Sequence, residues 1–124
     1  MPQIKAKLDT SWLSKIADFI EETAKALGCQ DPHVIDDLKL AVDEASTNIM
    51  THGKKGQKKD HFIIQMNKEG RQIEVEIIDF GNSFPFDQAI SKDGFGIQFI
   101  KQVTEKAEYK SFPDKNVLRF HKNF

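Results

Sequence analysis

The stretch DPHVIDDLKLAVDEASTNIMTHG, residues 31–53, predicts a long helix that organises the rest of the chain. Asp31 can cap the first turn, and Pro32 suits the first helical position, where no backbone N–H is needed. The helix is expected to end near His52 and Gly53. Apolar residues recur with the helical period and define its buried stripe, which consists of Ile35, Leu38, Ala41, Val42, Ala45 and Ile49.

Residues before this stretch predict one strand and another helix. Apolar and polar residues alternate from Ile4 to Leu8, which is typical of a half-buried strand. Thr10 or Ser11 can then cap a helix that ends at Gly28, because glycine accepts the left-handed conformation common after a helix. The apolar stripe of that helix consists of Trp12, Ile16, Phe19, Ile20, Thr23 and Leu27.

Residues after this stretch predict two hairpins with a third helix between them. The first hairpin has strands at residues 61–66 and 72–79, joined by a loop at residues 67–71. Residues 80–94 are rich in Gly, Pro, Asn, Asp and Ser, which favours a loop. The closing hairpin has strands at residues 107–112 and 117–122. The third helix should begin near Phe95 or Gly96, and its buried residues should be Ile97, Ile100, Val103 and Ala107.

This order of elements predicts an α+β fold, a two-layer α/β sandwich. About five strands would form a mixed, mostly antiparallel sheet, with three helices on one face. The 124 residues make one ordinary domain, residues 1–124. We expect a cytoplasmic protein that binds neither nucleic acid nor a membrane. The net charge is −1, no apolar run is long enough to span a bilayer, and the single cysteine cannot form an internal disulfide.

Glu44 and Asn48 are the first candidate functional residues. They lie four residues apart, so they share one face of the long helix, at the edge of its buried stripe. An amide oxygen together with phosphate oxygens can hold Mg²⁺, and a carboxylate beside it can act as a base. A solvated Glu and a polar Asn near a helix end would give the same pattern, so the pair alone leaves both interpretations open.

Two glycine-containing segments supply further candidates. Asp79 ends a predicted buried strand, where its carboxylate could accept a hydrogen bond from an exocyclic amine such as that of adenine. Gly81 would let a ring approach the backbone. Gly94 and Gly96 open the third helix, where backbone N–H groups favour a phosphate. Ordinary turns would also explain each segment when it is taken alone.

In this order and spacing, the three segments resemble the N, G1 and G2 boxes of the GHKL ATPases, a superfamily that includes gyrase, Hsp90, histidine kinases and MutL. The similarity extends to the small bacterial anti-sigma factor serine/threonine kinases of the partner-switching type. LAVDEASTNIMTHG (residues 40–53) is similar to their E-A-x-x-N box, and DFGNSF (residues 79–84) to their D-x-G-x-S-F form. DGFGIQFIKQVTEKAEY (residues 93–109) is similar to their G-x-G-L-x-L-I stretch. The resemblance covers nearly the whole chain.

The resemblance implies a Bergerat-type ATP-binding fold with ATP and Mg²⁺ as cofactors. It implies that Glu44 is the general base, that Asn48 is the Mg²⁺ ligand, and that Asp79 binds the adenine amine. Lys92 is a candidate phosphate contact or a solvated lysine. Other residues implied to shape or contact the nucleotide pocket are Gly81, Ser83, Gly94, Phe95, Gly96, Ile97 and Asn116.

The implied activity is transfer of the ATP γ-phosphoryl group to a serine or threonine of an anti-sigma factor antagonist, a STAS-type protein. The implied protein also sequesters a sigma factor and forms a homodimer. Residues 85–93 are shorter than the lid expected over the phosphates, and Lys115-Asn116 replaces the usual Gly-Thr. These departures keep an alternative open, in which a non-catalytic or weakly nucleotide-binding module acts by holding its partners.

Overall fold

The core of the fold is a five-stranded sheet with the strand order β1-β2-β3-β5-β4. The computed structural model describes residues 2–52, 57–81, 100 and 103–124. Its strands are β1 (Gln3–Lys7), β2 (His61–Glu69), β3 (Gln72–Asp79), β4 (Lys106–Ser111) and β5 (Asn116–Asn123). Its helical elements are the 3₁₀ turn η1 (Thr10–Trp12), α1 (Leu13–Ala26) and α2 (Pro32–His52).

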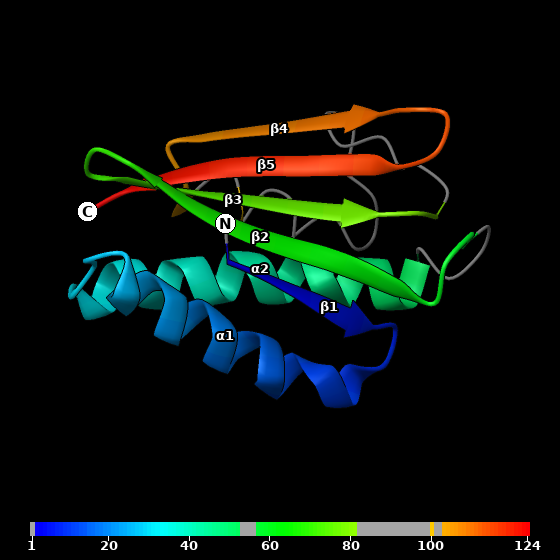
Figure 1. Ribbon diagram of the computed structural model, residues 1–124, viewed down its shortest axis with the longest axis horizontal. Helices are drawn as coiled ribbons and strands as arrows, with labels where there is room; N and C mark the ends of the chain where they lie inside the picture. The colour runs from blue at the N-terminus through cyan, green and yellow to red at the C-terminus, as the bar shows by residue number, and fades with distance from the viewer. Residues whose placement is uncertain (1, 53–56, 82–99, 101–102) are drawn as a thin grey trace.

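The two helices α1 and α2 pack against each other on one side of the sheet (Figure 1). Residues of β3 alternate between the two faces, so that Ile73, Val75 and Ile77 are buried against the helices. Leu118 and Phe120 of β5 are buried on the same face. The residues between them lie on the other face of the sheet, which neither helix covers. The predicted two-layer α+β sandwich is therefore confirmed.

All pairings between these five strands are antiparallel, where the sequence predicted a mixed, mostly antiparallel sheet. The two hairpins β2–β3 and β4–β5 account for two pairings, as expected. β3 then pairs with β5 rather than with its sequence neighbour β4. Among the described residues, no helix combines the length and the apolar character that crossing a bilayer requires.

The long helix α2 has the predicted ends and the predicted buried stripe. The His33 N–H donates to Asp31 Oδ1 at 2.9 Å, which is the capping bond expected of Asp31. All six predicted stripe residues are at most 5% exposed. The core therefore forms between this stripe and the inner face of the sheet.

Helix α1 begins differently from the prediction. Asp9, rather than Thr10 or Ser11, provides the cap, because its Oδ1 accepts the Ser11 N–H at 2.9 Å and starts the 3₁₀ turn before α1. Ala24 is fully buried, while Thr23 is only partly buried. Gly28 has φ +101°, so the prediction that glycine ends this helix in a left-handed conformation is confirmed.

The first hairpin is longer than predicted. β2 continues to Glu69, so the turn consists of Gly70 and Arg71 alone. Gly70 has φ +61°, the conformation that a tight hairpin turn requires and that glycine adopts at low cost. The sequence missed this extension because the last residues of β2 are polar and exposed, and so show no alternation.

The third predicted helix lies mostly outside the described residues. Ile100 and Val103 are helical, and the Thr104 N–H donates to the Ile100 carbonyl at 3.2 Å. Ile100 is fully buried, as predicted. Ala107 belongs to β4 instead of this helix, because β4 already begins at Lys106 and pairs Ala107 with Phe120.

Candidate functional site

Asp79 and Asn116 form a buried polar pair where β3 ends and β5 begins. The two residues are direct partners in the β3–β5 register. Asp79 is 5% exposed and Asn116 is 2% exposed. Asn116 Nδ2 donates to Asp79 Oδ1 at 3.0 Å and to the Gly81 carbonyl at 2.9 Å. The Gly81 N–H donates to the same Asp79 oxygen at 3.1 Å. The carboxylate is thus held in one orientation by two donors.

Burial raises the pKa of Asp79 above its ordinary value of 3.8. The dominant cause is removal of the carboxylate from water, which disfavours its charged form. The hydrogen bonds from Asn116 and from the Gly81 N–H act in the opposite direction and lower the pKa. A perturbed carboxyl group beside a pocket is a mark of functional sites, although structural networks perturb pKa values as well.

A small pocket lies between α2 and the inner face of the sheet beside this pair. Asp79 of the sheet and Asn48 of α2 line it from opposite layers. The remaining lining residues are apolar or aromatic: Ala45, Ile49, Ile77, Ile100, Tyr109 and Leu118. Apolar walls with a few convergent polar groups are typical of small-molecule sites. The cavity itself is small, about 10 Å³, so a ring carrying a hydrogen-bonding amine would enter only if the side chains around it moved apart.

Glu44 lies one helical turn before Asn48 on α2 and is half-buried. It does not line this pocket. Because residues four apart lie on the same face of a helix, Glu44 and Asn48 form a row that leads away from the pocket. The structure therefore brings Asn48, Asp79, Gly81 and Asn116 together, with Glu44 next to them.

Several predicted site residues lie outside the described residues. They are Ser83, Lys92, Gly94, Phe95, Gly96 and Ile97. The predicted short lid at residues 85–93 lies there too. The roles inferred for these residues from the sequence therefore stay predictions.

Tyr109 is a lining residue that the sequence did not single out. It lies on β4 opposite Leu118 of β5, on the face of the sheet that carries the pocket. Ala107 and Tyr109 lie two residues apart in the predicted closing hairpin, so both were expected on the same face of the sheet. That spacing could have identified Tyr109 as a lining residue. The two hydrogen bonds that Asn116 donates were harder to predict from the sequence, because they depend on the β3–β5 register rather than on a local pattern.

Comparisons with known proteins agree with this architecture. Residues 6–122 match the sequence model of the histidine kinase-like ATPase domain. A serine-protein kinase RsbW of Bacillus subtilis (strain 168) is 43% identical over 54 residues, which cover 44% of this chain and 34% of the kinase. A serine-protein kinase RsbW of Bacillus velezensis is 27% identical over 92 residues, which cover 62% of this chain and 58% of that kinase. These matches therefore span between a third and three fifths of the curated relatives.

Solved structures share the fold at low sequence identity. The crystal structure of the RsbU and RsbW domains of Rv1364c from Mycobacterium tuberculosis has a TM-score of 0.76 at 13% identity, covering 99% of this chain and 32% of that chain. The catalytic domain of the histidine kinase ThkA has a TM-score of 0.56 at 11% identity, covering 99% of this chain and 96% of that chain. At these identities the likeness concerns the fold alone.

Proposed function

Because this chain belongs to the histidine kinase-like ATPase domain family, we propose that it binds ATP with Mg²⁺ and phosphorylates a serine or threonine of a partner protein. The observation that carries the proposal is that Asp79 and Asn48 contribute to one apolar pocket from opposite layers of the fold. In this proposal Asp79 recognises the base, and Asn48 contacts the phosphates that extend from the base along α2.

Asp79 is the base-recognising residue in this proposal. Its Oδ1 accepts the hydrogen bonds from Gly81 and Asn116, and we assign its Oδ2 to the exocyclic amine of adenine. The ring would lie among the apolar side chains of the pocket. A buried, oriented acceptor discriminates strongly between a ligand that donates a hydrogen bond and one that does not.

Asn48 and Glu44 act on the phosphate side. An amide oxygen is a hard ligand that suits Mg²⁺, an ion that keeps several waters and shares its site with substrate phosphates. When bound, Mg²⁺ would neutralise charge on the β- and γ-phosphates. The carboxylate of Glu44 would accept the proton of the attacking hydroxyl. The hydroxyl oxygen bonds to the γ-phosphorus while the bond from that phosphorus to the bridging oxygen of ADP breaks.

The two RsbW relatives, which are named serine-protein kinases, support this assignment to protein phosphorylation. We further propose that the phosphorylated partner is a STAS-type anti-sigma factor antagonist, that the chain also sequesters a sigma factor, and that it acts as a homodimer in the cytoplasm. Together these roles make a partner switch, in which phosphorylation of the antagonist decides which protein the chain holds.

A second function remains open because of the length of residues 85–93, which are shorter than the lid expected over the phosphates. A lid excludes water and encloses the reacting groups. In this alternative the chain binds its partners, with nucleotide held weakly or not at all, and transfers no phosphoryl group. The two functions share the partners and differ in catalysis.

Calorimetry with Mg²⁺-ATP and Mg²⁺-ADP tests the nucleotide site. Binding and a raised unfolding temperature are expected at millimolar nucleotide, because a ligand specific for the folded state stabilises it. The absence of both effects would reject the site.

Catalysis requires a purified antagonist and γ-labelled ATP. Glu44→Gln should lower the transfer rate by at least about 100-fold while ATP binding persists, since general-base catalysis contributes roughly 10²–10⁴-fold. Equal transfer rates in the variant and in wild type would exclude Glu44 as the base. Complete absence of transfer in wild type, with ATP and both partners bound, would favour the sequestering module.

A further inference from the structure

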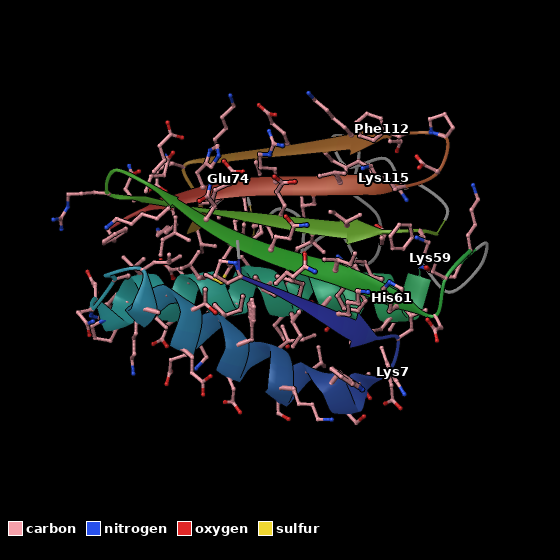
Figure 2. The ribbon with its side chains drawn as sticks, viewed as in Figure 1. Lys7, Lys59, His61, Glu74, Phe112 and Lys115 are labelled. Atoms are coloured by element: carbon pink, nitrogen blue, oxygen red, sulfur yellow. The ribbon has the colours of Figure 1, made fainter. Side chains whose placement is uncertain are left out.

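The end of the sheet beside the pocket carries a cluster of lysines and aromatic rings. We call this cluster the basic edge, and its members are Lys58, Lys59, Phe80, Phe112 and Lys115. They come from three segments: the residues before β2, the residue after β3, and the β4–β5 turn. Figure 2 shows Lys59, Phe112 and Lys115 at the same end of the sheet.

Two hydrogen bonds and a cation–π contact hold the three segments of the basic edge together. The Lys58 N–H donates to the Phe80 carbonyl at 3.0 Å, and Lys58 Nζ donates to the Pro113 carbonyl at 2.9 Å. Lys59 Nζ lies 4.4 Å from the centre of the Phe80 ring. Lys58 thus ties the segment before β2 to the β4–β5 turn, and the surface is positioned before any partner arrives.

The β4–β5 turn presents an apolar ring next to a positive charge. Phe112 is 46% exposed, and Lys115 Nζ lies 5.8 Å from its ring centre. The Phe112 N–H donates to the Lys115 carbonyl at 2.8 Å, which closes the turn. Among the described residues, only one other large hydrophobic side chain, Leu40 at 48%, is counted as exposed. An aromatic ring held open to solvent beside lysines is a suitable anchor for a partner.

The charges of the chain are unevenly distributed around these two exposed residues. Leu40 lies on α2 among acidic residues, which are Asp36, Asp37, Asp43 and Glu44. Phe112 lies in the basic edge, which has three lysines, and Figure 2 places Lys7 at the same end of the sheet. Exposed Asp60 and Asp114 lie in the same segments, so the three lysines leave a small local excess of positive charge in a chain whose net charge is −1.

We propose that the basic edge docks an acidic segment of the protein substrate. An apolar side chain of that segment packs on Phe112, and its carboxylates pair with Lys59 and Lys115. The inference rests on the proposed function, since it names the surface by which that kinase holds its partner. A protein segment suits this surface because it can place an apolar side chain on Phe112 and single carboxylates at the two lysines, away from exposed Asp60 and Asp114 in the same segments. A nucleic acid carries a negative charge at every phosphate and cannot space its charges in this way.

The basic edge adjoins the residues that we assign to the base. Phe80 lies between Asp79 and Gly81, and Lys115 directly precedes Asn116. A partner held here therefore contacts backbone that continues into the base-binding pair. Any effect of the partner on nucleotide affinity must then be matched by an equal effect of nucleotide on partner affinity.

The probe is a fluorescein-labelled ten-residue peptide that contains two Leu, with Glu or Asp at every other position. Fluorescence anisotropy measures its binding to the protein. The acidic peptide should bind at low salt and weaken as salt rises, because exposed charges are screened. A peptide with Ser in place of Leu should bind more weakly, and one with Lys in place of the acidic residues should not bind. Equal binding of the acidic and basic peptides would overturn the proposal.

Variants of the basic edge locate the binding site. Lys59→Glu with Lys115→Glu should weaken peptide binding by about tenfold or more, and Phe112→Ala by about fivefold. Two variants in the helical layer are the controls. Lys25→Glu reverses the charge of a lysine whose side chain is 53% exposed, and Leu40→Ala removes an exposed apolar side chain. The controls should change the affinity less than twofold. An unchanged affinity in the edge variants, or an equal loss in the controls, would contradict the proposal.

Three further measurements separate the remaining outcomes. A labelled oligothymidine that binds more tightly than the acidic peptide would replace the protein partner by a nucleic acid. Self-association in sedimentation experiments, abolished by Phe112→Ala and by Leu40→Ala alike, would replace it by a second copy of the chain. Calorimetry with Mg²⁺-ATP on the same proteins checks their folding and the proposed function. Peptide binding without ATP binding would reject that function, whereas ATP binding without peptide binding would reject the docking surface.

Discussion

The strands β3 and β5 carry two polar cross-strand pairs that face opposite sides of the sheet. Asp79 and Asn116 face the helices and are at most 5% exposed. Glu76 and Arg119 are also register partners, but they lie on the uncovered face, where the Arg119 side chain is 43% exposed. The same two strands therefore hold one buried polar pair and one pair that is open to solvent.

The two pairs differ in how well their geometry is determined. Oδ1 of Asp79 accepts two hydrogen bonds, and its donor Asn116 makes a second bond to Gly81. On the other face, Arg119 spreads its contacts over Glu76 at 3.3 Å and Glu74 at 3.5 Å, and His121 reaches Glu74 at 3.1 Å. A buried polar group must be satisfied, while an exposed ion pair competes with water. The buried pair therefore holds its carboxylate in the better-defined position.

The largest expected effect is on nucleotide binding by Asp79→Asn. The substituted amide can still accept from Gly81 and Asn116, but its NH₂ group meets the adenine amine as donor against donor. Affinity for Mg²⁺-ATP should fall about 100-fold, a loss typical of a hydrogen bond to a charged group. Calorimetry measures this loss, and urea unfolding of the same variant shows that the fold persists. An affinity within threefold of wild type would remove Asp79 from the base site.

Asn116→Ala should have the next largest effect, on stability. It leaves the buried Asp79 oxygen and the Gly81 carbonyl each without one donor, which should cost about 2 kcal/mol of unfolding free energy. Asn123→Ala is the matched control on the same strand, because Asn123 is exposed and its side chain accepts one hydrogen bond, from the side chain of Gln72. The bond from its backbone N–H to Glu105 does not depend on the side chain that is removed. Its cost should stay below about 0.5 kcal/mol. Equal costs in urea unfolding would contradict the distinction between the two ends of β5.

The pH dependence of stability gives a smaller and directional test. The pKa of Asp79 is raised in the folded state, so the folded chain binds this proton more tightly than the unfolded chain does. The resulting stabilisation is fully present below pH 3.8 and is lost as the pH rises through the folded-state pKa. Relative to wild type, Asp79→Asn should therefore gain stability as the pH rises across this window. A constant difference from pH 3 to 7 would show that burial does not perturb this carboxyl group.

The smallest effect is expected for Arg119→Gln on the uncovered face. Its exposed ion pairs are weakened by water and salt, so the loss of stability should be below about 0.5 kcal/mol at 0.15 M salt. Urea unfolding at low and high salt measures it. A loss as large as that of Asn116→Ala would contradict the distinction between the two faces of the sheet.

Most of the fold could be predicted from the sequence because its local signals agree. The cap at Asp31 and the unbroken apolar stripe of α2 indicated both its extent and its buried face. The end of β2 was missed because its polar residues show no alternation, and the cap of α1 was misassigned among neighbouring Asp, Thr and Ser residues, which cap almost equally well. These errors concern boundaries and leave the order of elements unchanged.

The candidate site was only partly predictable. Asn48 and Asp79 could be proposed as neighbours from the resemblance, and the structure places both beside one pocket. The bond between Asn116 and Asp79 joins residues 37 positions apart and depends on β5 pairing with β3. No local pattern specifies that pairing. The contribution of Tyr109 depends on it as well, because β4 reaches the pocket only through β5.

The order of the strands also places lysines at both margins of the sheet. The outer strands are β1 and β4, with exposed Lys5 and Lys7 on the first and exposed Lys106 and Lys110 on the second. An outer strand offers unpaired backbone groups to which a strand of another chain can add, and charged side chains oppose that addition. These two margins are thereby protected against strand addition and the aggregation that follows from it.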